Sequence, residues 1–259
     1  MVVGFESFRE YFVGYEECYT IIGGTACDIL LSDAALPFRT TKDIDMILLI
    51  ENKFDEFATI FWKYIKDGGY RCGWKKSDAP HFYRFTEPKE GNFPEMIELF
   101  SRKPDFQLEH EGSHLTPLPV SDEISSLSAI MLDDNYYNLM LSGRRVVDGI
   151  SVLDAEYLIL FKAKAFLDLT RRKAEGEHVN ERDIKKHKSD VFRLFQIVNP
   201  SFRIVLPEAV AADMRAFIER MSNEQINLKA YGMGDFSQKE ILQKLEEMYL
   251  QEDIITVLS

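Results

Sequence analysis

The expected architecture rests on two neighbouring segments, Tyr19-Thr-Ile-Ile-Gly-Gly-Thr-Ala-Cys-Asp-Ile-Leu-Leu31 and Arg39-Thr-Thr-Lys-Asp-Ile-Asp-Met-Ile-Leu-Leu-Ile50. The apolar run from Cys18 to Ile22 predicts a strand, and the run from Ile44 to Ile50 predicts a buried central strand. The helical pattern from Thr25 to Leu36 lies between them and stops before Pro37. The sequence therefore predicts a strand, a helix and a second strand of one sheet.

The first turn and the second strand each carry residues suited to phosphate chemistry. Gly23 and Gly24 stand where the first strand becomes a helix, so the backbone can approach an anion closely at the positive end of the helix dipole. Asp43 and Asp45 are two residues apart on a strand, so both carboxylates leave the same face. Two adjacent carboxylates favour a hard cation such as Mg²⁺. A phosphate cradle beside a Mg²⁺ site is the requirement of phosphoryl or nucleotidyl transfer.

These residues resemble the signature of the nucleotidyltransferase superfamily, the DNA polymerase β-like fold, and within it the AbiEii/AbiGii toxin-like branch. That branch reads apolar-Gly-Gly-Thr-Ala, then a helix, then Arg-x-Ser/Thr-x-Asp-Ile-Asp. The matching residues here are Gly23, Gly24, Thr25, Ala26, Arg39, Thr41, Asp43, Ile44 and Asp45. The match covers about the first fifth of the chain. It implies an α/β (α+β) nucleotidyltransferase core with a mixed sheet, followed by a mostly helical C-terminal domain.

The resemblance also implies roles for individual residues. Asp43 and Asp45 would bind Mg²⁺, and Glu98 in the apolar setting Ile97-Glu98-Leu99 would complete the acidic set as the third catalytic carboxylate. Glu95 is the alternative candidate for that position. Gly23, Gly24 and Thr25 would hold the β- and γ-phosphates of a nucleoside triphosphate. Glu98 or a metal-bound hydroxyl would activate an acceptor for in-line attack on the α-phosphorus.

Two basic residues are expected to offset the charge of the triphosphate. Arg39 belongs to the first motif, and Lys162 matches a lysine that the branch places three positions before an alanine, here Ala165. Lys162 also lies on the apolar boundary of its helix, which is typical of a lysine that extends its charged end to the surface. A later acid of the branch is matched by Asp190, whereas His187 replaces an earlier aspartate.

Composition limits the classes of protein that need to be considered. The chain has 259 residues, 46% of them apolar and 12% aromatic, so it can bury a substantial core. The net charge of −12 argues against an extended DNA-binding surface. No apolar run is long enough to span a bilayer, and the first residues carry no basic leader. Three widely spaced cysteines (Cys18, Cys27 and Cys72) favour reduced thiols in a cytoplasmic protein.

The rest of the chain divides at about residue 153. We expect a nucleotidyltransferase-like domain over 1–153 and a helical domain over 154–259 that closes the nucleotide cleft. The first part should contain helices over 5–15 and 53–66 and further strands over 70–74, 81–86, 94–101, 136–142, 144–147 and 150–153. The second part should contain helices over 156–173, 181–198, 207–221 and 237–250.

Two other functional classes compete with the nucleotidyltransferase. One is a degenerate member of the same fold that binds nucleotide or a partner without turnover, since fold does not guarantee chemistry. The other is a zinc hydrolase, because His110, Glu111 and His114 form an HExxH pattern. Gly112 and Ser113 inside that pattern disfavour the helix it needs. The acceptor stays open between transfer RNA, a protein and a small molecule, and the resemblance allows an antitoxin partner.

Overall fold

The computed structural model describes residues 3–49, 54–74, 82–100, 130 and 133–251. The seven strands that the structure describes form one mixed sheet in the order β3-β4-β5-β2-β1-β7-β6. Neighbours pair antiparallel except β1 with β7 and β2 with β5, which are parallel. The strands are β1 (Tyr19–Ile22), β2 (Asp43–Leu48), β3 (Arg71–Trp74), β4 (Phe82–Thr86), β5 (Met96–Phe100), β6 (Arg144–Val147) and β7 (Ile150–Leu153). The predicted α+β class with a mixed sheet is confirmed.

The helices of the first part pack on this sheet. Helix α1 (Phe5–Phe12) contacts α3 (Phe54–Gly68), and Phe12 lies between Tyr19 of β1 and Phe57 of α3. Helix α2 (Gly23–Asp33) begins directly where β1 ends. The sheet centre and these aromatic side chains form the core of this half, which fixes the ends of β1 and β2 relative to α2.

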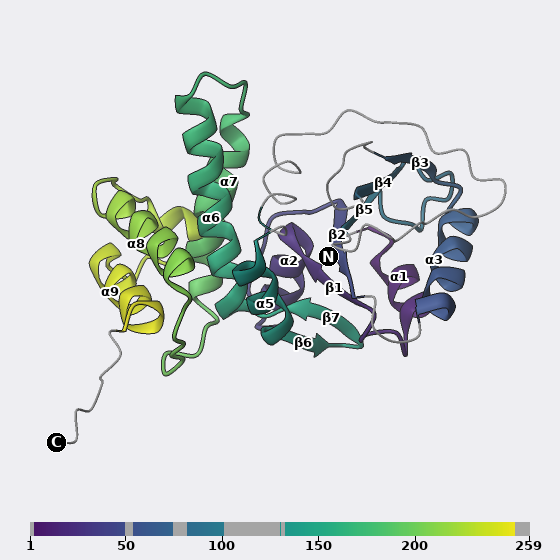
Figure 1. The fold of residues 1–259 in the computed structure, drawn as a ribbon, viewed down its shortest axis with the longest axis horizontal. Coiled ribbons are helices and arrows are strands. Elements are labelled where there is room, and N and C mark those ends of the chain that lie inside the picture. Colours follow the sequence, from purple (N-terminus) through teal and green to yellow (C-terminus); the bar gives the residue numbers. More distant parts are fainter. Residues whose placement is uncertain (1–2, 50–53, 75–81, 101–129, 131–132, 252–259) are drawn as a thin grey trace.

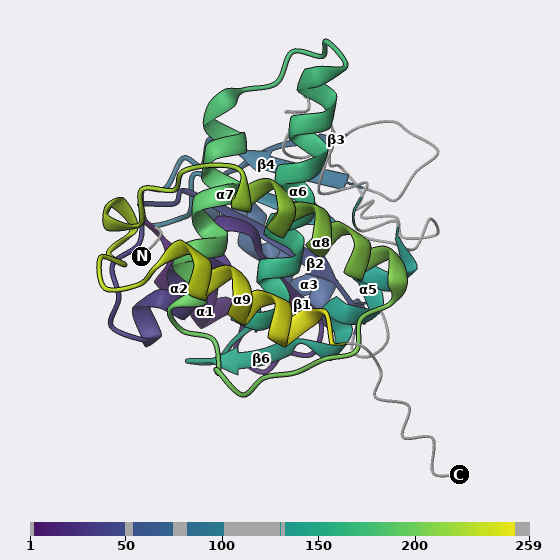
Figure 2. The same cartoon turned by 90° about the vertical axis from the view of Figure 1, so that its left-hand side faces the viewer.

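Helices dominate the second part, as the sequence predicts. Helices α6 (Ala155–Ala174) and α7 (Glu181–Phe195) lie side by side, and α2 contacts both. Figures 1 and 2 show α8 (Glu208–Ser222) and α9 (Gln238–Tyr249) on the far side of this pair from the sheet. A short 3₁₀ helix, η1 (Leu228–Tyr231), packs against α7. Buried apolar side chains form one continuous cluster from Phe5 to Tyr249. The division at residue 153 stays a prediction.

One predicted strand is wrong. Residues 136–142 belong to helix α5 (Asp134–Ser142), not to a strand. The side chain of Asp133 caps this helix by accepting hydrogen bonds from the backbone N–H groups of Asn135 (2.8 Å) and Tyr136 (3.4 Å). Tyr136, Leu139 and Met140 are its buried residues, and their spacing of three and four places them on one helical face. The apolar residues of this segment therefore follow the helical period.

Candidate active site

Gly23 and Asp45 make the closest contact between the two motifs. Ile22 of β1 is paired with Asp45 of β2, and Gly23 follows at the first turn of α2. The backbone of Gly23 has φ +70°, a left-handed conformation that favours glycine, and a Cβ added there would lie 1.9 Å from Oδ2 of Asp45. Residue 23 must therefore be glycine for the Asp45 carboxylate to lie against the start of α2.

The start of α2 is suited to an anion. The residue at the N-cap position, Ile22, makes no side-chain hydrogen bond to this helix, and the first turn contains no acidic residue. The backbone N–H groups of the first turn have no partner within a helix, and the helix dipole makes this end positive. This end is therefore available to a negatively charged ligand, as the glycine pair predicts.

A small pocket joins the predicted residues at this point. Its volume is about 150 Å³, and Asp43, Asp45, Gly24 and Arg39 line it. The same pocket is lined by Thr40, Thr41, Lys42 and Lys186. Since a water molecule takes about 30 Å³ of liquid volume, the pocket has room for phosphate groups but not for a whole nucleotide. Both carboxylates of the Asp-x-Asp pair therefore reach one cavity, together with three basic side chains.

Glu98 lies on the neighbouring strand, directly opposite Asp45. Its side chain is buried, and Oε1 accepts hydrogen bonds from Arg84 of β4 at 2.8 Å. Burial and, after it, the adjacent Asp45 raise the pKa of Glu98 to about 9, against the opposing effect of Arg84. Arg84, Glu98 and Asp45 thus form a row of ionisable groups across β4, β5 and β2.

Glu95, the alternative third carboxylate, has a different environment. Its side chain is 59% exposed and pairs with Lys42 at 2.8 Å. It precedes β5, whereas Glu98 lies in the middle of that strand. The structure therefore brings Glu98, and not Glu95, beside Asp45.

The hydroxyl of Thr25 is used within the protein. It donates a hydrogen bond to the backbone carbonyl oxygen of Asp43 and lies 3.5 Å from Oγ1 of Thr41. Thr25 is the third residue of α2 and is buried, and its hydrogen bond ties this helix to the start of β2. Its observed contribution is to hold the Asp43 backbone in place beside the pocket.

A buried ion network holds the side chain of Arg39. Asp190 of α7 is fully buried, and its Oδ2 lies 2.9 Å from Nζ of Lys162 on α6 and 3.2 Å from Nη2 of Arg39. Burial would raise the pKa of Asp190, but Lys162 and Arg39 outweigh burial and lower it. His187 is buried nearby and also lowers the pKa of Asp190. Arg39 lines the pocket, whereas Lys162 pairs with Asp190 and is not among the residues that line the pocket.

Arg84 and Lys186 are members of this site that the sequence reasoning did not assign. Arg84 is a single base among the aromatic residues of β4, which complements the single acid Glu98 in β5. Lys186 lies one helical turn before Asp190, so both can share a face of α7. In each case the signal is a charged residue at a position whose spacing points it inward.

The alternative zinc site lies outside the described residues, because His110, Glu111 and His114 fall in the segment 101–129. Among the residues that the structure does describe, no group of three His, Cys, Asp or Glu side chains is placed to hold a metal ion by itself. Cys18 and Cys27 are buried free thiols. Within the same described part, every helix is too short or too polar to cross a membrane.

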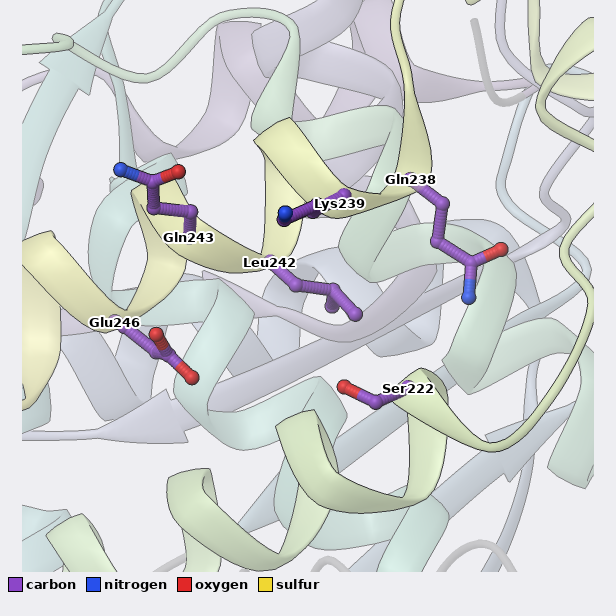
Figure 3. Close-up of a pocket in the computed structure, with 6 residues that line it drawn as sticks. All are labelled: Ser222, Gln238, Lys239, Leu242, Gln243 and Glu246. Atoms are coloured by element: carbon purple, nitrogen blue, oxygen red, sulfur yellow. The ribbon is translucent and has the colours of Figure 1, made fainter.

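A larger hollow lies between α8 and α9 and has a volume of about 720 Å³. Gln238 and Leu242 extend from α9 toward the end of α8, where Ser222 lies (Figure 3). The other residues that line it are Lys239, Gln243 and Glu246. It contains no glycine turn and only one carboxylate, so the smaller pocket at Gly24 is the candidate active site.

The chain was compared with known protein families, curated proteins and solved structures. No known protein-family model matches the chain. None of the curated proteins matches it. Among solved structures, it is similar to an antigenic nucleotidyltransferase-like protein from Paracoccidioides brasiliensis, with 12% sequence identity and a TM-score of 0.47. The similarity covers 95% of this chain and 91% of that chain.

Proposed function

We propose that the protein is a Mg²⁺-dependent nucleotidyltransferase that moves a nucleoside monophosphate from a nucleoside triphosphate to an acceptor. One observation carries the proposal: Asp43 and Asp45 line the same pocket as Gly24 and Arg39, and Asp45 lies against the first residue of α2. A pair of carboxylates, the positive start of a helix and basic side chains around one pocket are the groups that nucleotidyl transfer uses.

The carboxylates in the pocket fit Mg²⁺. This ion prefers oxygen donors, and proteins often hold it through one or two carboxylates while phosphate and water oxygens complete its shell. Asp43 and Asp45 would be the protein's donors. When bound, Mg²⁺ would neutralise charge on the phosphates. Glu98 as a third metal ligand stays part of the proposal, since it neighbours Asp45.

The remaining groups would bind and orient the triphosphate. The backbone N–H groups at Gly23 and Gly24 would donate hydrogen bonds to phosphate oxygens. Arg39 and Lys186 would contribute positive charge from the pocket wall. Lys162 would act indirectly, because it helps Asp190 to hold Arg39 in place.

Glu98 is the candidate for the proton acceptor. With a pKa of about 9, Glu98 is largely protonated at neutral pH, so it accepts a proton only in its ionised form, whose share grows as the pH rises toward 9. In the proposed reaction, the acceptor hydroxyl loses its proton to Glu98, its oxygen forms the bond to the α-phosphorus, and pyrophosphate leaves. The acceptor is a transfer RNA, a protein or a small molecule, and the protein is proposed as the toxin of a toxin–antitoxin pair.

A Mg²⁺ and nucleotide titration tests this proposal. Thermal melting is measured for the wild type and for the Asp43→Asn/Asp45→Asn variant, with each nucleoside triphosphate alone and with Mg²⁺. A ligand at about 100 times its Kd adds about 2.7 kcal/mol, which raises the Tm of a chain of this size by on the order of 5 °C. We expect this rise in the wild type and its loss in the double variant. Glu95→Gln, which alters an exposed acid outside the pocket, should keep the rise.

Incubation with labelled triphosphates and candidate acceptors then tests transfer. Label on an acceptor, absent with the double variant, would support the transferase. Mg²⁺-dependent binding without transfer to any acceptor would favour the degenerate binding protein instead. No Tm rise with any nucleotide in the wild type would contradict the nucleotide site itself.

A further inference from the structure

A second row of residues extends from the candidate active site along helix α7. Lys186, Asp190 and Arg193 are spaced by four and three residues, so they lie on one face of this helix. Lys186 lines the pocket and Asp190 holds Arg39, which also lines it. Arg193 is therefore the next residue on that face beyond the pocket.

Arg193 lies between two aromatic rings. Its guanidinium carbon is 5.9 Å from the centre of the Phe38 ring and 5.6 Å from the centre of the Tyr231 ring in η1. The guanidinium carbon of Arg39 lies 4.9 Å from the same Phe38 ring. Phe38, Arg193 and Tyr231 are all partly exposed. Arginines and aromatic rings thus alternate in a continuous row that begins at the pocket.

The charge of Arg193 has no acidic partner among the described residues. By contrast, Arg203, Arg215 and Arg220 each pair with a glutamate. The chain carries 43 acidic and 31 basic residues, so a half-buried arginine without a carboxylate is not explained by a shortage of acids. The N–H groups of Arg193 are therefore positioned by aromatic packing and remain available to a ligand.

The row begins beside the proposed phosphate position at Gly24. Nη2 of Arg39 lies 3.1 Å from the place that a Cβ of Gly24 would occupy, and the same guanidinium contacts the Phe38 ring. A phosphate at Gly24 would thus be separated from Phe38 by one arginine side chain. Since the pocket of about 150 Å³ holds phosphates only, the ribose and base must extend beyond it.

We propose that Phe38 and Arg193 form the platform on which the base of the bound nucleotide stacks. This inference rests on the proposed function and adds the part of the site that recognises the base. Flat aromatic and guanidinium groups stack on nucleobases, whose faces every nucleotide shares. A free inorganic phosphate has no such face, so the platform distinguishes a nucleotide from its phosphate chain alone.

The test compares two probes on the full chain in the presence of Mg²⁺. Binding of each nucleoside triphosphate and of inorganic tripolyphosphate is measured by calorimetry for the wild type, Phe38→Leu and Arg193→Met. Phe38→Leu replaces the ring with another apolar side chain. Arg193→Met removes the charge and leaves an apolar side chain of similar length. Arg215→Met is the matched control, because Arg215 is exposed on α8 and pairs with Glu208. Thermal melting confirms that each variant is folded.

We expect each platform variant to lower the affinity for the tightest-binding nucleoside triphosphate about tenfold, because each removes one stacking contact of the base. Tripolyphosphate affinity should stay unchanged, and the control should match the wild type with both probes. Equal losses for the two probes, or no loss for the nucleotide, would overturn the platform. A wild type that binds tripolyphosphate as tightly as nucleotides would also overturn it while leaving the phosphate site intact. A wild type that binds neither probe would overturn the proposed function as well.

Discussion

Gly23 shows how one residue can be required for both the fold and the proposed chemistry. Its left-handed backbone turns the chain from β1 into α2, and its missing side chain leaves room for the Asp45 carboxylate. The carboxylate and the positive start of α2 are therefore adjacent because no Cβ separates them. Any larger residue at this position would have to displace the carboxylate from the pocket.

Gly23→Ala tests this double requirement, and Gly149→Ala is its control. Both glycines have left-handed backbones, with φ +70° and +76°, but a Cβ at Gly149 would meet no atom within 4 Å. The control should lose about 1–2 kcal/mol of unfolding free energy from backbone strain alone. Gly23→Ala should lose more, and it alone should lose the Tm rise with Mg²⁺ and nucleotide. Denaturant unfolding and thermal melting measure the two effects. Equal losses with retained nucleotide binding would contradict the assigned role of Gly23.

Local spacing was sufficient to identify some residues of the site and insufficient for others. Asp43 and Asp45 could be predicted to share a face because the period of a strand is two. Glu98 stood out because an acid between apolar residues needs a partner. Its partner Arg84 lies on a different strand, and no local pattern specifies which strands become neighbours. The same holds for Lys186, whose place at the pocket depends on how α7 packs.

Between elements, the decisive contact is the ion network that joins α6, α7 and the segment before β2. Asp190 supplies one buried carboxylate to two cations, Lys162 and Arg39, from two other parts of the chain. Removing that carboxylate leaves both cations without their buried counter-charge, and breaking a buried pair in this way costs about 3–5 kcal/mol. The network therefore links the position of the helices to the position of Arg39 in the pocket.

Asp190→Asn should lower the unfolding free energy by about 3 kcal/mol and weaken nucleotide binding, because Arg39 loses its anchor. The matched control is Asp33→Asn on α2. Asp33 also accepts from a cation, Arg145, at 3.0 Å, but its side chain is 49% exposed and lies outside the pocket. This partly exposed pair should contribute at most about 1 kcal/mol. Denaturant unfolding measures both variants, and equal costs at the two positions would contradict a special role for the buried network.

Element types were predictable from period and capping wherever the pattern was long. The helices over α6 and α9 follow their predicted bounds closely, with Asp154 and Ser237 as caps. Helix α5 was missed because its nine residues are rich in tyrosine and leucine, which also suit a strand. Its cap, Asp133, precedes the apolar residues and is the signal that separates the two interpretations. Short apolar segments of this kind stay ambiguous without their flanking residues.

At the scale of the molecule, the buried apolar side chains that the structure describes form one cluster rather than two. The cluster contains Phe8 of α1, Ile44 of β2, Phe161 of α6 and Leu245 of α9. Helix α2, which carries the glycine turn, contacts α6 and α7, so the proposed site is built from residues on both sides of position 153. The two predicted parts, 1–153 and 154–259, follow one another along the chain. We therefore expect each to depend on the other for its stability.

This continuity predicts that the chain unfolds in one cooperative transition. If the sheet and the helices share one core, then exposing the face of α6 also exposes α2, and neither half gains stability by itself. Calorimetry should give equal calorimetric and van't Hoff enthalpies, and Asp190→Asn should move the entire transition to lower temperature. The control is Arg215→Met, which alters an exposed pair and should leave the transition in place. Two separate transitions, only one of which moves in Asp190→Asn, would show instead that the helical part folds as an independent domain, and the site would then lie at a junction whose parts can move relative to each other.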